Sequence, residues 1–448
     1  MEFPCGYDDK IGVRDVLRIS LPMMISSLSS HFMIILDQLV LARFSINAMT
    51  GVASATVWCS AFQFSITTIT MVASAFVGQY NGAKRFHLTG TPVWQMIWFS
   101  LSLFVFTIPF SQVGGRYCIP PLLSQHGLPY FETIICFTPI CGICQALSSF
   151  FVAVGRGILV TVSILVANVV NVVLDIILVF GYFGMDRFTG SRGAAIGTVI
   201  AWFVNCCILS LFFFKRNIRE KYCTTNCKFH FQELAGYLKL GAAGGVGHIC
   251  EMLAWGVIYY TLATVGTDVA MIQSIAVSVN VFLAFVVSGL EKGVMSITAN
   301  LLGAGITHQT ATLIKKGITI HLTFTAIVSI VFLFAPEIIT QNFIRFEIDE
   351  SLLRETHLIL RFVLLYFMID GICWVIAGAL EAGGDFGFTM GAIAIYIWSI
   401  VTIPSFILAK TGHLNARLTW SLLIIAISTI SYVLYGRFKS GKWMHIRV

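Results

Sequence analysis

Four carboxylic acids lie in stretches of sequence that are otherwise almost entirely apolar: Asp37, Asp175, Glu251 and Asp370. An ionised carboxylate in the middle of a lipid bilayer costs about 2.5 to 3.5 kcal/mol, so the four together would cost about 10 to 14 kcal/mol. That sum rivals the stability of a typical folded protein. Each acid must therefore be protonated, paired with a polar group, or ready to hold a cation.

Polar residues precede three of these acids by three, four or seven positions, which places them on the same face of a helix as the acid. Asn168 and Asn171 precede Asp175, His248 precedes Glu251, and Tyr366 precedes Asp370. Their oxygens and nitrogens could share a proton with the acid or complete the shell of a small hard cation. We therefore expect these acids to bind a proton or a sodium ion, and two of them, Asp37 and Asp175, fall in the first half of the chain and two, Glu251 and Asp370, in the second. The alternative is a structural hydrogen bond between helices, worth only about 0.6 kcal/mol on average.

The segment SGLEKGV places Glu291 and Lys292 side by side within an apolar run. Adjacent residues of a helix point in different directions, so these two charges are not expected to neutralise one another. Lys292 could pair with Glu251 or Asp370. Alternatively, the pair lies near the membrane surface and Lys292 reaches toward lipid head groups. We interpret Glu291 and Lys292, together with Asn168 and His248, as modulators of the cation site.

The elements that position these residues must be membrane-spanning helices. Of 448 residues, 57% are hydrophobic and 11% are charged, whereas a soluble domain carries about 25% charged residues. Apolar runs of the roughly 20 residues that a spanning helix requires recur along the whole chain. We predict an all-α polytopic membrane protein with twelve spanning helices, whose approximate cores are residues 17–41, 51–78, 93–113, 131–153, 159–183, 193–214, 237–264, 270–300, 317–341, 357–381, 387–409 and 416–435.

The distribution of basic residues predicts the orientation in the membrane. The polar, acidic start MEFPCGYDDK is unlike a secretory signal, so the first helix is expected to stay attached. With the amino terminus inside, 18 of the 28 Lys and Arg residues face the cytoplasm, which predicts cytoplasmic termini and a multi-pass protein of the inner (plasma) membrane. The net charge of +7 then reflects a basic surface facing anionic lipid, and no nucleic-acid partner is expected.

Two halves of the chain are related by an internal repeat. A shift of 221 residues brings LRISLP at Leu17 onto LKLGAA at Leu238, and GQYNGAK at Gly78 onto ANLLGAG at Ala299. Six helices per half is an even number, so two such bundles would be related by a pseudo-two-fold axis along the membrane normal, as in many transporters. The predicted parts are an amino-terminal lobe (1–214), a cytoplasmic linker (215–236), a carboxy-terminal lobe (237–436) and a basic cytoplasmic tail (437–448).

Over essentially its whole length the chain resembles the multidrug and toxic compound extrusion (MATE) transporters. The resemblance rests on Pro22 with Asp37 fifteen residues on, on VGQYNGAKR, on NVVNVVLDIILVFG followed by GAAIGTVI, on GHICEM and on YFMIDGICWVIAGALEAGG. It implies two six-helix bundles in a V around a central cavity. It also implies an amino-terminal polar site at Asp37, Asn171, Asp175 and Thr198, and a carboxy-terminal cation site at Glu251, Tyr366 and Asp370. Glu291 and Lys292 depart from the family pattern, in which many members have uncharged residues.

Together with these features, the resemblance implies an antiporter that exchanges sodium or protons for amphipathic, mostly cationic organic compounds and drugs. Pro22 removes a backbone hydrogen bond from the first helix, which gives it a hinge at which ionisation of Asp37 could change its bend. The sequence shows no nucleotide-binding motif and no catalytic constellation, so we expect a transporter rather than an enzyme. We also expect a monomer that needs no cofactor besides the coupling ion. The alternatives are a lipid-linked oligosaccharide flippase of the same superfamily, which would want a cavity rich in Arg and Lys, and a non-transporting polytopic membrane protein.

Overall fold

A computed structural model describes residues 11–182, 190–343 and 349–445, and helices are the only regular secondary structure in these ranges. Six helical rods form the first half. They are α1 (Val13–Phe44), α2 (Ile46–Gly82), the pair α3 (Gly90–Ser102) and α4 (Phe104–Cys118), the pair α5 (Ser124–Phe137) and α6 (Pro139–Ala153), α7 (Gly157–Val179) and α8 (Ser191–Phe213). The α5–α6 rod bends by 45° at its break, where Pro139 begins α6 and cannot donate a backbone hydrogen bond.

The second half repeats this pattern after the short α9 (Arg216–Tyr222). Its rods are α10 (Phe231–Val265), α11 (Thr267–Gly303), α12 (Thr310–Phe334), α14 (Glu350–Ala382), α15 (Phe386–Tyr396) continued through a π-turn (Ile397–Thr402) into α16 (Ile403–Lys410), and α17 (Ala416–Lys439). The expected span 317–341 is wrong at its end, because α12 stops before Ala335 and Pro336 and the short α13 (Glu337–Phe343) follows. Proline at that position cannot continue the ladder of helical hydrogen bonds.

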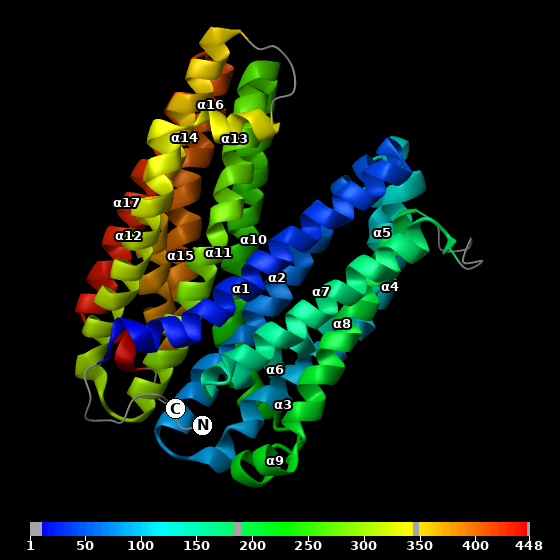
Figure 1. The fold of residues 1–448 in the computed structure, drawn as a ribbon. Coiled ribbons are helices and arrows are strands. Elements are labelled where there is room, and N and C mark those ends of the chain that lie inside the picture. The colour runs from blue at the N-terminus through cyan, green and yellow to red at the C-terminus, as the bar shows by residue number, and fades with distance from the viewer. Residues whose placement is uncertain (1–10, 183–189, 344–348, 446–448) are drawn as a thin grey trace.

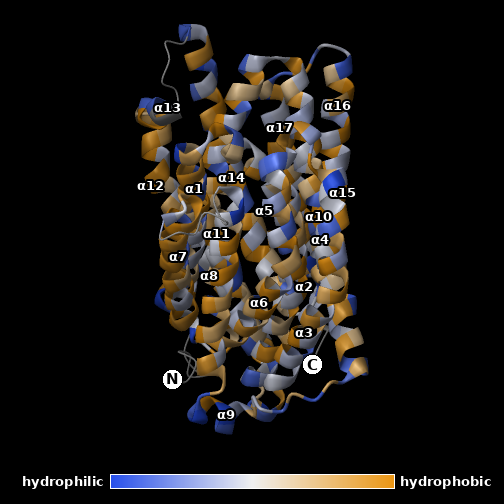
Figure 2. Ribbon diagram, turned by 90° about the vertical axis from the view of Figure 1, so that its right-hand side faces the viewer, coloured by the Kyte–Doolittle hydropathy of each residue, from blue (hydrophilic) through white to orange (hydrophobic). Residues whose placement is uncertain are grey.

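Most of these rods are long and apolar enough to cross a membrane. Ten helices in the described ranges meet that description, or eleven if the bent α5–α6 pair counts as one span. The remaining rod, α10, is 35 residues long but is rich in glycine and carries His248 and Glu251. Hydrophobic residues run along the helices, while hydrophilic ones gather around α9 (Figure 2). The all-α polytopic fold class is therefore confirmed.

The two halves diverge from one end of the molecule and form a V (Figure 1). The carboxy-terminal lobe has one large apolar core, and the amino-terminal lobe has several smaller ones. Helix α1 belongs to both, because Val16, Ile19 and Met24 lie in the core of the carboxy-terminal lobe, whereas Met23 packs in that of the amino-terminal lobe. In Figure 1, α1 accordingly begins beside the carboxy-terminal lobe and ends at the tip of the other.

The ends of α2 and α11 form a seam between the lobes. A Cβ atom added to Gly82 would lie 2.0 Å from the Asn300 carbonyl oxygen, and one added to Gly303 would lie 1.9 Å from the Gln79 carbonyl oxygen. The shift of 221 residues turns each of these contacts into the other, and it also relates Gly78 to Ala299, which pack directly together. The seam thus has the self-complementary form of a two-fold interface, as expected for the internal repeat.

Hydrogen bonds connect this seam to neighbouring helices in the same two-fold manner. The Gln79 side chain donates to the Ala382 carbonyl oxygen at the end of α14 (2.8 Å). Its counterpart Asn300 donates to the Ala153 carbonyl oxygen at the end of α6 (2.9 Å), and Asn81 donates to the Asn300 side-chain oxygen (2.7 Å). The backbones of the two lobes therefore approach closely at this end only because glycine stands at Gly82 and Gly303.

Candidate functional site: buried carboxylates in both lobes

Helix α7 presents Asn171 and Asp175 on one face, where they are 3% and 1% exposed. Four residues apart, they lie one turn from each other, and Asn171 Nδ2 donates to Asp175 Oδ1 (3.0 Å). Asp37 comes from the outer part of α1, and its carboxyl group interacts with that of Asp175. Asp37 Oδ1 and Asp175 Oδ2 are buried without a hydrogen-bond partner. Two carboxyl groups therefore meet with acceptor capacity to spare, which suits a shared proton or a small cation.

Helix α8 is shaped to receive Asp175. A Cβ atom added to Gly197 would lie 2.3 Å from Asp175 Oδ1, so the absence of a side chain there makes room for the carboxyl group. The neighbouring Thr198 donates its hydroxyl to the Ala194 carbonyl oxygen of its own helix (3.0 Å). Tyr130 on α5 interacts electrostatically with both Asp37 and Asp175. Sequence reasoning missed Gly197 and Tyr130, because neither carries a signal that separates it from other glycines and tyrosines of an apolar helix.

Asn168 and Pro22, the other residues of this lobe that the sequence analysis singled out, both connect α7 to α1. Asn168 donates to the Ser29 hydroxyl (2.7 Å) instead of joining Asp175. Pro22 lies inside α1, and its carbonyl oxygen accepts a hydrogen bond from the Thr161 hydroxyl (2.7 Å). Pro22, which has no backbone N–H to donate, is thus held against α7 at a point fifteen residues before Asp37.

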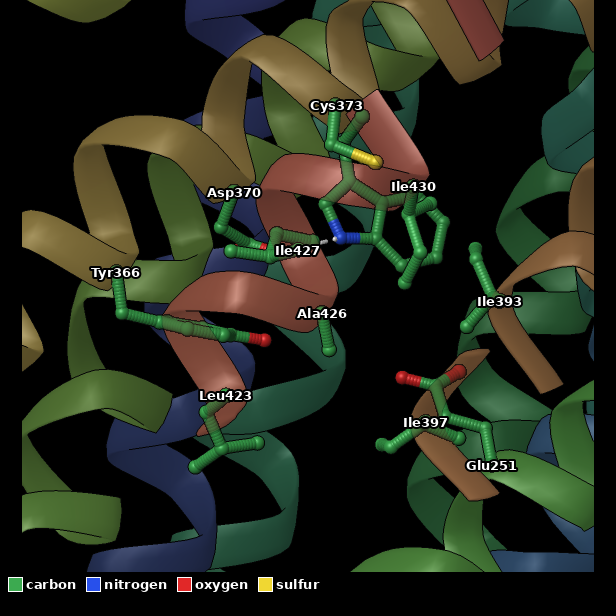
Figure 3. Close-up of a pocket in the computed structure, with 11 residues that line it drawn as sticks. Glu251, Tyr366, Asp370, Cys373, Ile393, Ile397, Leu423, Ala426, Ile427 and Ile430 are labelled. Carbon is green, nitrogen blue, oxygen red and sulfur yellow. Dashed lines mark hydrogen bonds between the residues drawn. The ribbon is translucent and has the colours of Figure 1, made fainter. Parts of the chain in front are cut away.

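In the other lobe, Glu251, Tyr366 and Asp370 line one pocket, in line with what the family resemblance implies. Glu251 lies on α10 across the pocket from Tyr366 and Asp370 on α14, and apolar residues of α15 and α17 complete the wall (Figure 3). The cavity has a volume of about 30 Å³, which is room for one or two water molecules. It fits a small ion with water and is too small for a drug-sized compound.

Each acid of this pocket has one polar neighbour. Trp374 Nε1 donates to Asp370 Oδ1 (3.1 Å). His248 Nδ1 lies 3.3 Å from Glu251 Oε2, but without hydrogen-bond geometry, so that oxygen remains unsatisfied. Tyr366 packs edge-on against Trp420, with ring centroids 5.8 Å apart. Each lobe therefore combines two carboxyl groups, and in this pocket the unsatisfied oxygen belongs to Glu251.

The side chains of Glu291 and Lys292 leave α11 in different directions, as expected for adjacent residues of a helix. Glu291 is buried and interacts electrostatically with Glu251 and His248. No salt bridge in the described ranges joins Lys292 to Glu251 or Asp370. Lys292 lines a second pocket, between the lobes. The expectation that it pairs with either acid is therefore wrong, because its helix turns it toward the amino-terminal lobe.

A further buried acid, Glu381, was missed. Glu381 on α14 is fully buried, both of its carboxyl oxygens lack a hydrogen-bond partner, and it interacts electrostatically with Glu291. The signal was present in the sequence, since Glu381 ends the apolar run that contains Asp370. Within the described residues, no three His, Cys, Asp or Glu side chains are close enough to hold a metal ion, so a bound sodium ion would need amide, hydroxyl or water oxygens besides the carboxylates.

Comparison with known proteins agrees with this geometry. The family model described as MatE matches residues 22–177 and 248–407, which together make up well over half of the chain. This chain belongs to the MATE family. The two matched stretches fall in the two lobes, so each lobe carries one copy of the MATE pattern.

Curated MATE relatives cover nearly the whole chain. The multidrug export protein MepA of Staphylococcus haemolyticus is 23% identical over 93% of this chain and 91% of its own length. The probable multidrug resistance protein NorM of Thermotoga maritima is 22% identical over 96% and 93%. The multidrug resistance protein NorM of Vibrio cholerae is 22% identical over 94% of each.

Solved MATE structures share the fold. The eukaryotic MATE transporter AtDTX14 superposes with a TM-score of 0.78 at 16% identity, over 96% of each chain. A MATE family multidrug resistance transporter in an outward-facing conformation superposes with a TM-score of 0.83 at 15% identity, also over 96% of each chain. This MATE protein is thus a multi-pass membrane protein of a transporter family, and family members are transporters of small molecules rather than enzymes.

Proposed function

We propose that this protein is an antiporter that exports amphipathic, mostly cationic organic compounds in exchange for sodium ions or protons. Its relatives named MepA and NorM are described as multidrug export and multidrug resistance proteins, which supports the export of drugs by this chain. The observation that carries the coupling is the meeting of Asp37 and Asp175, two carboxyl groups on different helices whose buried oxygens Asp37 Oδ1 and Asp175 Oδ2 have no partner.

The coupling follows from the free energy of those two groups. Two adjacent carboxylates cannot both remain ionised in an apolar surrounding unless a proton or a cation lies with them. Because Asp37 is on α1 and Asp175 is on α7, the position of α1 relative to α7 decides how well the pair holds its ion. An ion gradient drives export when the ion favours one arrangement of the helices over the other by a few kcal/mol.

The carboxy-terminal pocket offers a second ion site of the same type. Glu251 and Asp370 face one small cavity from two helices, and the Trp374 indole is a hydrogen-bond donor that favours an ionised Asp370. Its size suits a sodium ion with a water molecule. We assign substrate binding to the space between the lobes and ion binding to the two sites inside them.

We place the seam between α2 and α11 on the cytoplasmic side, with both termini cytoplasmic as the positive-inside rule requires. In that orientation the V opens to the outside. The resemblance in fold to an outward-facing relative supports this assignment.

Efflux from proteoliposomes tests the proposal. The purified chain is reconstituted, ethidium or a fluoroquinolone is loaded, and a sodium gradient and a pH gradient are imposed separately. We expect one gradient to accelerate efflux and the other to have little effect, and Asp37→Asn to abolish the acceleration while the protein still inserts. Efflux that ignores both gradients, or full coupling in Asp37→Asn, would contradict the proposal.

A further inference from the structure

A second pocket lies between the lobes, away from both carboxylate sites. Most of its lining comes from α1, α2, α6 and α7 of the amino-terminal lobe, and α11 contributes Lys292 and Met295 from the other lobe. Its volume is about 60 Å³, enough for about four water molecules. A pocket of this size accommodates one small polar group of a larger compound rather than the whole compound.

The polar groups in this pocket are hydrogen-bond donors and one cation. They are Ser26, Ser74, Gln145, Ser148, Ser149 and Lys292, and no carboxylate lines the pocket. Ser74 and Ser149 are 4% and 2% exposed, and in the described part of the chain neither hydroxyl donates to a protein group. Ser149 only accepts a long hydrogen bond from Gln145 Nε2 (3.4 Å). Hydroxyl protons are therefore available to a guest.

Lys292 is the positive charge of this pocket. It is half-buried, and no acidic side chain among the described residues lies within 4.0 Å of its ammonium group. The adjacent Glu291 interacts with it electrostatically but is buried on the other side of α11, where its backbone packs against Gly378 of α14. Hydroxyl and amide groups thus line the pocket beside the Lys292 ammonium group, a set of donors that suits an anion from outside the protein.

We propose that this pocket binds the anionic group, a carboxylate above all, of a compound that occupies the space between the lobes. Resting on the proposed function, this inference assigns a place in the protein to the carboxylate of a zwitterionic substrate, whose apolar body lies between the lobes while the carboxylate contacts Lys292 and the serines. The single cation also distinguishes this site from one for a pyrophosphate, which would need several basic side chains. Both lobes contribute to the lining of the pocket, and Lys292 comes from α11. The anion is therefore bound only while α11 lies against α6.

The test compares norfloxacin, a zwitterion, with its ethyl ester, a cation of nearly the same shape. Binding of each to the purified full-length protein is measured in a neutral detergent. We expect Lys292→Gln to weaken norfloxacin binding about tenfold and to leave the ester within about twofold, since only the zwitterion has a charge for Lys292 to contact. Lys292→Arg should keep norfloxacin binding, and Ser148→Ala should weaken it about threefold by loss of one hydrogen bond. Unchanged binding of the ester shows that each variant is folded.

Lys315→Gln, which removes an exposed lysine on α12, is the matched control and should change neither affinity. Equal effects of Lys292→Gln on both compounds, or no effect on norfloxacin, would overturn the proposal. Competition by added phosphatidylglycerol that depends on Lys292 would assign the anion to a lipid head group and overturn the substrate assignment. Norfloxacin binding that depends on Lys292 without any gradient-driven efflux would leave this site standing and refute the proposed antiport.

Discussion

The pairing of Asp37 with Asp175 gives two ordinary side chains an unusual role. Either one alone in an apolar helix would have to be neutral, paired with a polar group or bound to a cation. Together they hold two buried oxygens with no partner, Asp37 Oδ1 and Asp175 Oδ2, while Asn171 fixes the other oxygen of Asp175. The amide thus orients one carboxyl group, and the remaining oxygens are available to the ion of the proposed antiport.

Replacement of Asp175 by asparagine tests this role directly. The amide keeps the shape and can still accept from Asn171, but it cannot release a proton or contribute charge. We expect Asp175→Asn to reduce gradient-driven efflux by about tenfold or more, because the ion no longer distinguishes the two arrangements of α1 and α7. Asp268→Asn, at an exposed position on α11, is the control. Wild-type coupling in Asp175→Asn would remove the acid from the mechanism.

Gly197 provides a second test that leaves both acids in place. Gly197→Ala would bring a methyl group to 2.3 Å from Asp175 Oδ1, so the carboxyl group must leave the position in which it interacts with Asp37. We expect weaker ion binding by about tenfold, measured as the sodium or proton concentration that gives half-maximal efflux. Gly236→Ala, with no atom within 4 Å of the added Cβ, should be neutral or slightly stabilising, because alanine favours helices more than glycine does. An unchanged ion requirement in Gly197→Ala would contradict the fit described here.

Among the helices, α1 is the element that connects the ion site to the arrangement of the lobes. Its first turns pack in the carboxy-terminal lobe, and its outer part carries Asp37 in the other. Pro22 lies within the stretch from Val16 to Met24 that packs in the carboxy-terminal lobe, fifteen residues before Asp37, and its carbonyl oxygen is held by Thr161 of α7. Any bend of α1 at Pro22 therefore changes the distance between Asp37 and Asp175 and the contact between the lobes at the same time.

Pro22→Ala should stiffen this connection. The variant restores a backbone N–H and keeps the Pro22 carbonyl bonded to Thr161, so we expect equal or higher thermal stability and transport slowed about fivefold or more. Pro109→Ala in α4, also inside a helix, should leave transport unchanged. The measurement is initial efflux rate together with melting temperature. Slower transport in both variants would indicate a general effect of helix proline rather than a hinge in α1.

The sequence predicted where the helices lie along the chain better than it predicted which helices pack against each other. Asp175 could be recognised because an ionised group within a long apolar run has a high free energy in a membrane. The apolar runs themselves predicted the membrane-spanning helices. The neighbours at spacings of three and four were only partly right, since Asn171 reaches Asp175 whereas Asn168 reaches Ser29 of α1. Spacing along one helix fixes a face but not which helix packs on that face. For the same reason, the direction of Lys292 could not be predicted from the residues around it.

The seam between α2 and α11 determines which end of the V is closed. Gly82→Ala and Gly303→Ala each place a methyl group about 2 Å from a carbonyl oxygen of the opposite lobe, which costs about 1 to 3 kcal/mol of overpacking in the closed seam. We expect either variant to shift the population toward the arrangement in which the seam is open. Because the two contacts are equivalent, the two variants should shift it by similar amounts.

Spin labels at Ile46 and Thr267, which begin α2 and α11 at the far ends from the seam, would report this shift. The distance between the labels should become shorter in both variants. Gly256→Ala on α10, with open space around the added Cβ, should keep the wild-type distance distribution. A change in only one of the two seam variants would show that the lobes do not meet as equivalent partners.

The reciprocal contacts at Gly82 and Gly303 have an evolutionary consequence. A surface that matches its own rotated copy needs to be encoded only once, so a polypeptide of half this length could have assembled the same contact by pairing with a second molecule. Fusion of two such copies would then free each half to diverge. One half could acquire Lys292 while its counterpart kept the inherited apolar residue, and the ancestral closure would remain intact.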